Sequence, residues 1–245
     1  MVSKESEAAL DAALGEISQV DSQVDLTGPS PTFAPLFDVA RIYALPARPY
    51  LRWIKPTFDR VLGLVALVLA IPLIALIGAV IWVSMGSPVF LAQDRVGLRG
   101  KVFRLWKFRT MAPDRRTTQL ELLGENRRRT HKSADDPRIT TLGRWLRATR
   151  LDEIPQLVNV VSGDLSLVGP RPEMVAIVAQ YEAWQHRRHA VKPGVTGLWQ
   201  ISDQGDKLLR DCTEMELAYL DQVSLRTDVQ ILLKTIPAMI KRQGI

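Results

Sequence analysis

Two adjacent carboxylates, Asp152 and Glu153, are the residues of this chain whose types and spacing best suit chemistry. Arg147 and Arg150 precede them, and Pro155 follows. A carboxylate beside two arginines stays ionised, and it can attack a phosphorus atom once a cation masks the phosphate charge. The same residues also fit a helix start, in which Asp152 is the N-cap, Glu153 favours the helix dipole and proline is tolerated. Both interpretations stay open at this point.

Two further segments present cations with little conformational freedom. Prolines 170 and 172 fix the backbone on either side of Arg171, so its guanidinium is held ready for a diphosphate. The segment Lys107–Met111 alternates cations, Lys107 and Arg109, with apolar residues, as a strand with one buried face does. A structural turn with a salt-bridged arginine explains the first segment equally well.

The pair His186 and His189 has the spacing of two metal ligands on one helix turn. The sequence offers no third ligand, and the neighbouring Arg187 and Arg188 oppose a cation, so we predict surface histidines without metal. Glycine-rich dinucleotide motifs, Walker sequences and Ser/His/Asp constellations are absent from the sequence.

A long run without charged residues precedes these segments in the chain. No Asp, Glu, Lys, Arg or His occurs between Arg60 and Asp94, and the core of the run is the 23 residues 61–83. As a helix these residues reach about 34 Å, enough to cross the ~30 Å hydrocarbon core of a bilayer. The sequence therefore predicts a membrane-inserted helix.

Pro72, at the midpoint of this run, favours a helix–break–helix. Each half would reach about 16 Å, half of the bilayer. Basic residues flank both ends, and the positive-inside bias assigns both flanks to the cytoplasm. A re-entrant segment over 51–86 satisfies both flanks, whereas a proline-kinked single span remains the alternative.

Composition and charge indicate the protein class and the division of the chain into parts. Hydrophobic residues at 47% and charged residues at 24% are globular values, which excludes a chain disordered throughout. The single cysteine, Cys212, excludes an intramolecular disulfide. The net charge of +6 divides into −4 over residues 1–50 and +10 over the remainder. We expect a flexible extension over 1–50 and a catalytic domain over 87–245.

The expected fold class is α/β, mostly helical. Short strands are predicted over 88–92 and 102–111, around a turn at 97–100. Helices are predicted over 117–131, 173–189, 211–220 and 229–242. The amphipathic helix that carries Ile139, Leu142, Trp145 and Leu146 can lie on anionic lipid or pack on the protein's own core.

Several segments together resemble the bacterial sugar transferase family, the monotopic polyprenol-phosphate phosphoglycosyl transferases, and its compact exopolysaccharide-type members above all. The resemblance covers about residues 55–242. It is carried by Lys107-Phe-Arg-Thr-Met111, Asp136-Pro-Arg138, Leu151-Asp-Glu-Ile-Pro-Gln-Leu157, Gly163-Asp164, Gly169-Pro-Arg-Pro172 and Lys192-Pro-Gly-Val-Thr-Gly-Leu-Trp-Gln200.

The resemblance implies a reaction and a location. A sugar-1-phosphate would pass from a UDP-sugar to undecaprenyl phosphate with release of UMP, starting a polysaccharide at the cytoplasmic face of the bacterial inner membrane. Asp152 would be the nucleophile that forms a phosphosugar–enzyme intermediate. Glu153 would assist as a partner of the required Mg²⁺, and Arg147 would hold a substrate phosphate. The membrane segment of the family is also a re-entrant, proline-broken helix.

Further site residues follow from the matched segments. Arg171, Lys107, Arg109 and Arg138 are candidate ligands of substrate phosphate or nucleotide, and Asp152 and Glu153 are candidate metal ligands. Glu216, where the family usually has Asp, is one more candidate metal ligand.

Two other positions depart from the family pattern. Ile71 stands before Pro72 where many members have Ser. Asp203-Gln204 replace the usual Gly-Arg, which removes a cation from the nucleotide side and adds a negative charge.

The expected function is therefore that of a membrane-bound phosphoglycosyl transferase with no nucleic-acid partner. A non-catalytic scaffold for polysaccharide assembly is the alternative that the changed 203–204 pair motivates. A nucleic-acid binder would rest only on the basic charge and lacks a recognisable module. Monomer and homodimer both remain open.

Overall fold

The computed structural model describes residue 43 and residues 48–112, 138–202 and 213–241. Most of the flexible extension expected over 1–50, the helix expected over 117–131 and the Asp203-Gln204 pair lie outside these residues. The described helical elements are η1 (Tyr50–Ile54), α3 (Lys55–Met85), η2 (Leu98–Gly100), α5 (Thr141–Ala148), η4 (Leu151–Gln156), α6 (Leu157–Ser162), α7 (Val175–Val178), η5 (Ala183–Ala190), α8 (Leu198–Ile201), α9 (Thr213–Gln222) and α10 (Leu225–Lys241). The strands are β1 (Phe90–Val96), β2 (Val102–Phe108), β3 (Ser166–Val168), β4 (Glu173–Met174) and β5 (Gly194–Thr196).

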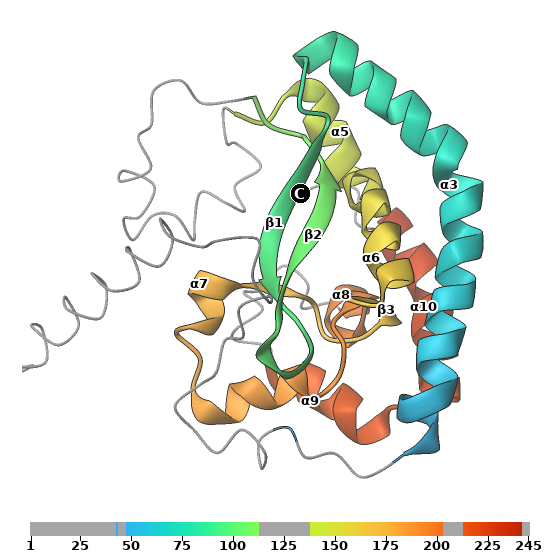
Figure 1. The fold of residues 1–245 in the computed structure, drawn as a ribbon, viewed down its shortest axis with the longest axis vertical. Coiled ribbons are helices and arrows are strands. Elements are labelled where there is room, and N and C mark those ends of the chain that lie inside the picture. The colour runs from blue at the N-terminus through green and yellow to red at the C-terminus, as the bar shows by residue number, and fades with distance from the viewer. Residues whose placement is uncertain (1–42, 44–47, 113–137, 203–212, 242–245) are drawn as a thin grey trace, which may run out of the picture. The chain divides into compact units, whose positions relative to one another are not determined.

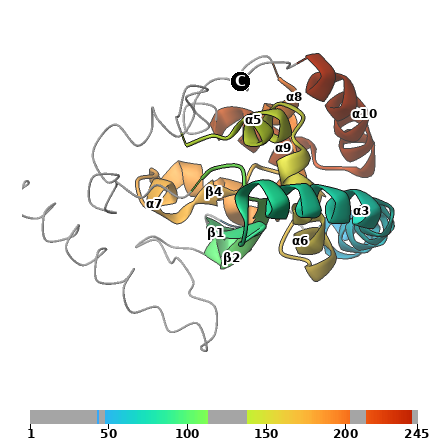
Figure 2. The same ribbon diagram turned by 90° about the horizontal axis from the view of Figure 1, so that it is seen from above.

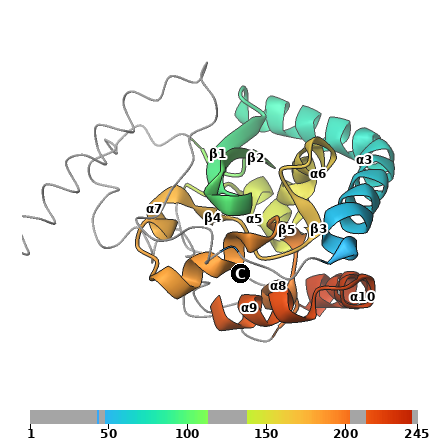
Figure 3. The same ribbon diagram turned by 60° about the horizontal axis from the view of Figure 1, so that its bottom comes forward.

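The charge-free run forms one helix, α3, that continues through Pro72. The sequence predicted a break at this proline, and the helix has none there. Instead α3 bends part-way along its length, as Figures 1 and 3 show. A proline inside a helix removes one backbone hydrogen bond and is a usual cause of such a bend. The bend divides α3 into a first arm before Pro72 and a second arm after it.

A buried charge cluster fixes the first arm to the rest of the fold. Lys55 Nζ lies 2.6 Å from Asp228 Oδ2 on α10 and 3.6 Å from Asp59 Oδ2 one turn along α3. Asp59 also accepts hydrogen bonds from Ser166 Oγ at 2.7 Å and from the Leu167 N–H at 3.2 Å. Because the charged groups are buried and paired, they fix the start of α3 against β3 and α10.

The first arm also packs closely on α6, as Figure 2 shows. Gly63 makes this approach possible, because a Cβ at that position would lie 2.6 Å from Val160 Cγ1. Val160 is fully buried in a core cluster with Phe103 and Leu105 of β2. The first arm is therefore part of the protein's own packing.

The second arm packs on β2 and α5. Ile77 and Ile81 are buried against Phe108 of β2 and Leu146 of α5. At the end of the arm, the Arg109 guanidinium donates hydrogen bonds of 2.5, 2.5 and 2.9 Å to the backbone carbonyls of Met85, Gly86 and Ser87. Both arms of α3 thus contact the same compact body.

The outer surface of α3 is apolar and exposed. Tyr50–Met85 is the one stretch among the described residues that is long and apolar enough to cross a membrane, and only 11% of its most apolar window is buried. Leu69 and Val83 are 75% and 80% exposed. A surface of this size and composition on a helix is typical of contact with lipid.

Two small sheets carry the remaining framework. The first has the order β2-β1-β4, with antiparallel pairs, and the second pairs β3 with β5 in parallel. The hairpin around residues 97–100 confirms the predicted turn. Its first strand extends further along the chain than predicted, to Val96, and its second ends at Phe108 instead of continuing to Met111.

The predicted amphipathic helix is present as α5, and it packs on the protein's own core. Leu146 is fully buried against the second arm of α3, whereas Trp145 is 53% exposed. Ile139 precedes α5 and pairs with Met111 in an isolated β-bridge.

The later helices differ in part from prediction. Residues 173–189 do not form one helix, because β4 pairs with Val96 and the chain then continues through α7 and η5. The helix expected over 211–220 is present as α9. The last helix, α10, begins at Leu225, four residues earlier than expected. Ser224 Oγ accepts the Thr227 N–H there, as a capping residue does.

Candidate functional site

The two adjacent carboxylates lie in the first turn of η4. Arg150, in the left-handed conformation with φ 56°, occupies the N-cap position that the sequence had given to Asp152. Successive side chains of a 3₁₀ turn point about 120° apart. Asp152 and Glu153 therefore project from different faces of the same turn.

Glu153 is held by cations. Arg171 Nη2 lies 2.8 Å from Glu153 Oε1, and Lys107 Nζ lies 3.9 Å from the same atom. Burial alone would raise the pKa of Glu153, but the Arg171 and Lys107 charges outweigh it and lower this pKa to about 2. Burial also lowers the pKa of the Lys107 ammonium to about 8. Glu153 is thus the ionised, engaged member of the acidic pair.

Asp152 is in the opposite condition. Burial and the neighbouring Glu153 charge raise its pKa to about 6, against the opposing effect of Lys107 and Arg147. In the part of the chain that the structure describes, no hydrogen bond or ion pair engages its carboxylate. A carboxylate that is partly desolvated, close to cations and not held by any of them is suited to act as a nucleophile.

Arg147 reaches the site from α5. Its Nε donates to Thr110 Oγ1 at 2.9 Å, just beyond the end of β2. Gly143, one turn earlier on the same helix face, lies against the Thr110 backbone, and a Cβ there would clash with the Thr110 carbonyl oxygen. The close approach of α5 to residue 110 therefore sets the position of Arg147.

Arg171 is positioned by more than its flanking prolines. Its backbone N–H donates to Glu216 Oε1 at 2.7 Å, and its carbonyl accepts from Arg188 Nη2 at 2.5 Å. Arg188 and Glu216 are joined by an ion pair, and both side chains are fully buried. The guanidinium carbon of Arg171 also lies 5.7 Å from the centroid of the Trp199 ring. A buried pair contributed by η5 and α9 thus holds the backbone of the arginine turn.

The prediction of surface histidines beside Arg188 was wrong. His186 and His189 are 2% and 4% exposed, and they pack with Tyr181, whose hydroxyl accepts from Arg188 Nη1 at 2.5 Å. Burial and the Arg188 charge lower the pKa of His189 well below its usual value. No pattern in the sequence signals this cluster, because η5 is packed against η2 and α9, which lie far from it along the chain.

Two of the predicted site residues, Arg109 and Glu216, have other partners, and a third, Arg138, makes a backbone contact. The guanidinium of Arg109 donates its hydrogen bonds to the backbone carbonyls at the end of α3. Arg138 precedes α5, where its carbonyl accepts the Ala112 N–H. Glu216 is bound by Arg188 and by the Arg171 N–H. Asp152, Glu153, Arg147, Lys107 and Arg171 are the predicted residues that the structure brings together.

A divalent cation fits this acidic pair. The described residues contain no group of three or more Asp, Glu, His or Cys side chains able to hold a metal. Mg²⁺ usually takes one or two carboxylates together with substrate phosphates and water, so it needs no larger cluster. Asp152 and Glu153 can supply such ligands, since the oxygens of Asp152 are not engaged by any described group.

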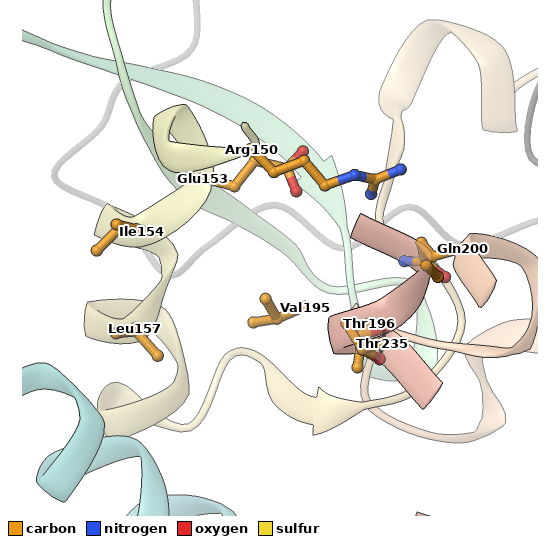
Figure 4. A pocket seen from close by; sticks show the side chains of 9 residues that line it. Arg150, Glu153, Ile154, Leu157, Val195, Thr196, Gln200 and Thr235 are labelled. Atoms are coloured by element: carbon orange, nitrogen blue, oxygen red, sulfur yellow. Dashed lines mark hydrogen bonds between the residues drawn. The ribbon is translucent and has the colours of Figure 1, made fainter. Parts of the chain in front are cut away.

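A pocket of about 180 Å³ opens beside η4, as Figure 4 shows. Arg150 and Glu153 lie at one end of it. Its other walls come from η4, α6, β5, α8 and α10, and are formed by Ile154, Leu157, Val195, Thr196, Gln200, Thr235 and Ala238.

Comparison with known proteins identifies the family of this chain. The family model for bacterial sugar transferases matches residues 50–242. The chain belongs to the bacterial sugar transferase family. It is 39% identical to the uncharacterized sugar transferase EpsL of Bacillus subtilis over 192 residues, which cover 78% of this chain and 90% of EpsL.

Two further relatives differ in length. The exopolysaccharide production protein ExoY of Sinorhizobium fredii is 35% identical over 196 residues, 78% of this chain and 87% of ExoY. The undecaprenyl-phosphate galactose phosphotransferase of Salmonella typhimurium is 36% identical over 202 residues, 79% of this chain. The match spans only 42% of the length of the Salmonella enzyme. In this sugar transferase the described part of the match contains the acidic pair and its neighbouring cations Lys107, Arg147, Arg150 and Arg171.

We predict that Gly143→Ala destabilises the sugar transferase by about 1–3 kcal/mol, because the new methyl group forces α5 away from the Thr110 backbone. The measurement is thermal unfolding of the purified protein in detergent. Gly78→Ala is the matched control, since a Cβ there meets Val89 Cγ1 at 3.5 Å, an ordinary contact. Equal melting temperatures of the two variants would show that α5 is not held so closely.

Proposed function

We propose that this chain transfers a sugar-1-phosphate from a UDP-sugar to undecaprenyl phosphate, releasing UMP, and so starts a polysaccharide. The observation that carries the proposal is the unengaged Asp152 carboxylate among cations, beside a Glu153 that two of those cations hold. The printed activity of the Salmonella relative, a galactose phosphotransferase acting on undecaprenyl phosphate, supports the substrate class. ExoY supports a role in exopolysaccharide production.

The first step is an attack by an Asp152 carboxylate oxygen on the phosphorus that bears the sugar. An oxygen–phosphorus bond to Asp152 forms while the bond from this phosphorus to the bridging oxygen breaks, and UMP leaves with the bond's electron pair. Asp152 must be ionised for this attack, so its position near Lys107 and Arg147 favours the reactive form.

The second step regenerates the carboxylate. A phosphate oxygen of undecaprenyl phosphate attacks the same phosphorus, and the Asp152 oxygen–phosphorus bond breaks. The products are a lipid-linked sugar diphosphate and free Asp152. One carboxylate can serve both displacements because the leaving group of the second step is the nucleophile of the first.

The surrounding residues have distinct tasks in this reaction. Lys107 and Arg171 hold Glu153 in place, and Arg147 offers its guanidinium to a phosphate of the donor. Mg²⁺, held by Asp152 and Glu153, would supply neutralisation of the diphosphate charge. Fixed cations of this kind stabilise charge that spreads over the transferring phosphoryl group.

We also propose that α3 is re-entrant and that the catalytic residues face the cytoplasm at the inner membrane. The anchoring of α3 supports this topology, since Lys55 holds its start and Arg109 its end on one compact body. The arginines and lysines beyond both ends favour the same side of the membrane.

We predict that Asp152→Asn lowers the rate of UMP release by on the order of 10⁴-fold or more, because an amide oxygen is a poor nucleophile. Single-turnover UMP release from a panel of UDP-sugars, with Mg²⁺ and undecaprenyl phosphate, measures this. Asp221→Asn, at an acid on the exposed end of α9 with a 63% exposed side chain, is the control and keeps the wild-type rate. UMP release by Asp152→Asn at the wild-type rate would remove Asp152 from the mechanism.

The rate of UMP release should have a bell-shaped pH profile. Asp152 has a pKa of about 6 and must lose its proton, so the rate rises as pH increases through about 6. Lys107 has a pKa of about 8 and loses its charge above it, so the rate falls at higher pH. The acidic limb belongs to the Asp152–Glu153 pair as a unit. A rate independent of pH between about 5 and 7, at fixed Mg²⁺, would contradict this assignment.

Topology can be tested by cysteine labelling in a Cys212→Ser background. We expect that neither Arg52→Cys nor Lys101→Cys reacts with a membrane-impermeant maleimide in intact spheroplasts, and that both react after the membrane is permeabilised. Arg52 precedes α3 in the chain and Lys101 follows it, at the hairpin turn after β1, and both positions are exposed in the structure. Opposite accessibility of the two cysteines would mean that α3 spans the membrane.

A further inference from the structure

The pocket beside η4 combines a charged end with apolar walls. Figure 4 shows Arg150 and Glu153 at one end, with Ile154, Leu157 and Val195 below them. The hydroxyl groups of Thr196 and Thr235, which also line the pocket, are 2.8 Å apart and hydrogen-bond to each other. Since these hydroxyls already have a partner, the interior of the pocket suits an apolar group.

The volume of the pocket limits what can enter. Sites for drug-sized ligands measure about 300–1,000 Å³, so a pocket of about 180 Å³ is too small for a UDP-sugar. A protein cavity of about 150 Å³ binds benzene, which has six carbons. One five-carbon isoprenyl unit therefore matches the available space.

The charged end of the pocket lies on the catalytic turn. Arg150 and Glu153 are three residues apart, so a 3₁₀ turn places them on one side, while Asp152 projects from another face of that turn. In Figure 4 the Arg150 side chain extends across the top of the pocket towards Gln200. A phosphate bound by Arg150 would thus lie on the turn that carries the Asp152 nucleophile.

The wall opposite η4 connects the pocket with the membrane-facing part of the fold. Thr235 and Ala238 of α10 line the pocket. The same helix is tied to the start of α3 through Asp228 and Lys55. Its other face carries an exposed apolar stripe, spaced four residues apart, of Leu225, Val229 and Leu233.

We propose that this pocket holds the first isoprenyl unit of the polyprenyl phosphate acceptor, while Arg150 binds the acceptor's phosphate. The proposal rests on the proposed function and adds the acceptor subsite to it. The donor diphosphate lies on the face of η4 that carries Asp152, next to Lys107 and Arg147. The acceptor approaches from the Arg150 side, so both substrates reach one carboxylate without sharing a pocket.

The test fills the pocket and measures the two steps separately. Ala238→Phe is expected to raise the KM for undecaprenyl phosphate in detergent micelles by about 10-fold or more, because the apolar contact with the isoprenyl unit is lost. UMP release in a single turnover without acceptor is expected to stay at the wild-type rate. Leu233→Phe introduces the same ring on the exposed face of α10 and keeps the wild-type KM.

A second variant tests the charged end without filling the pocket. Arg150→Asn is suitable because asparagine tolerates the left-handed conformation that residue 150 adopts. We expect a similar rise in the KM for undecaprenyl phosphate, with partial recovery in Arg150→Lys. Thermal unfolding of each variant identifies any loss that comes from misfolding, and the Arg150 pair decides the test if Ala238→Phe does not fold.

The outcomes separate this inference from the proposed function. A wild-type protein that releases no UMP from any UDP-sugar would overturn the proposed function. Normal UMP release together with an unchanged acceptor KM in Ala238→Phe and Arg150→Asn would overturn the pocket assignment alone. A change only in the dependence on bulk phospholipid would also overturn it, since the pocket would then hold a membrane lipid chain.

Discussion

Two adjacent carboxylates in a partly buried turn set the constraint on which the structure around them depends. Neighbouring like charges oppose one another's ionisation, and burial opposes it further. The fold resolves this by directing Arg171 and Lys107 to Glu153 and leaving Asp152 unengaged. One carboxylate is thereby made a fixed part of the framework, and the other keeps a reactive oxygen.

Each cation near this pair depends on a different part of the fold. Lys107 comes from β2, whose neighbour Phe108 packs on the second arm of α3. Arg171 comes from a turn whose backbone is bound by the buried Arg188–Glu216 pair. Since α3, β2, α5 and Leu151 of η4 share one apolar cluster, the long apolar helix and the turn of the acidic pair are parts of one packed unit. A movement of α3 would be transmitted to the turn through these contacts.

The sequence predicted the parts of the site that lie in local patterns. The acidic pair, the proline-flanked Arg171 and the apolar run were all visible as short segments. The structural role of Arg109, which was predicted as a phosphate ligand, was not visible, because Lys107 and Arg109 share a face only while the strand continues, and β2 ends at Phe108. The Arg109 guanidinium instead donates hydrogen bonds to the backbone carbonyls at the end of α3. The burial of Arg188 and Glu216 was equally hidden, because each needs its partner from a distant element.

The basic residues after residue 50 have different roles in the structure. Lys107 and Arg171 point inward to a carboxylate, while Lys55 and Arg109 hold the two ends of the bent helix. These cations are occupied with architecture, so the net charge of +10 overstates what is available to bind a polyanion. Arg147 and Arg150, which precede the acidic pair in the chain, are the cations that we propose bind the two substrate phosphates. A reaction that joins a soluble diphosphate to a lipid phosphate at one atom requires such a division.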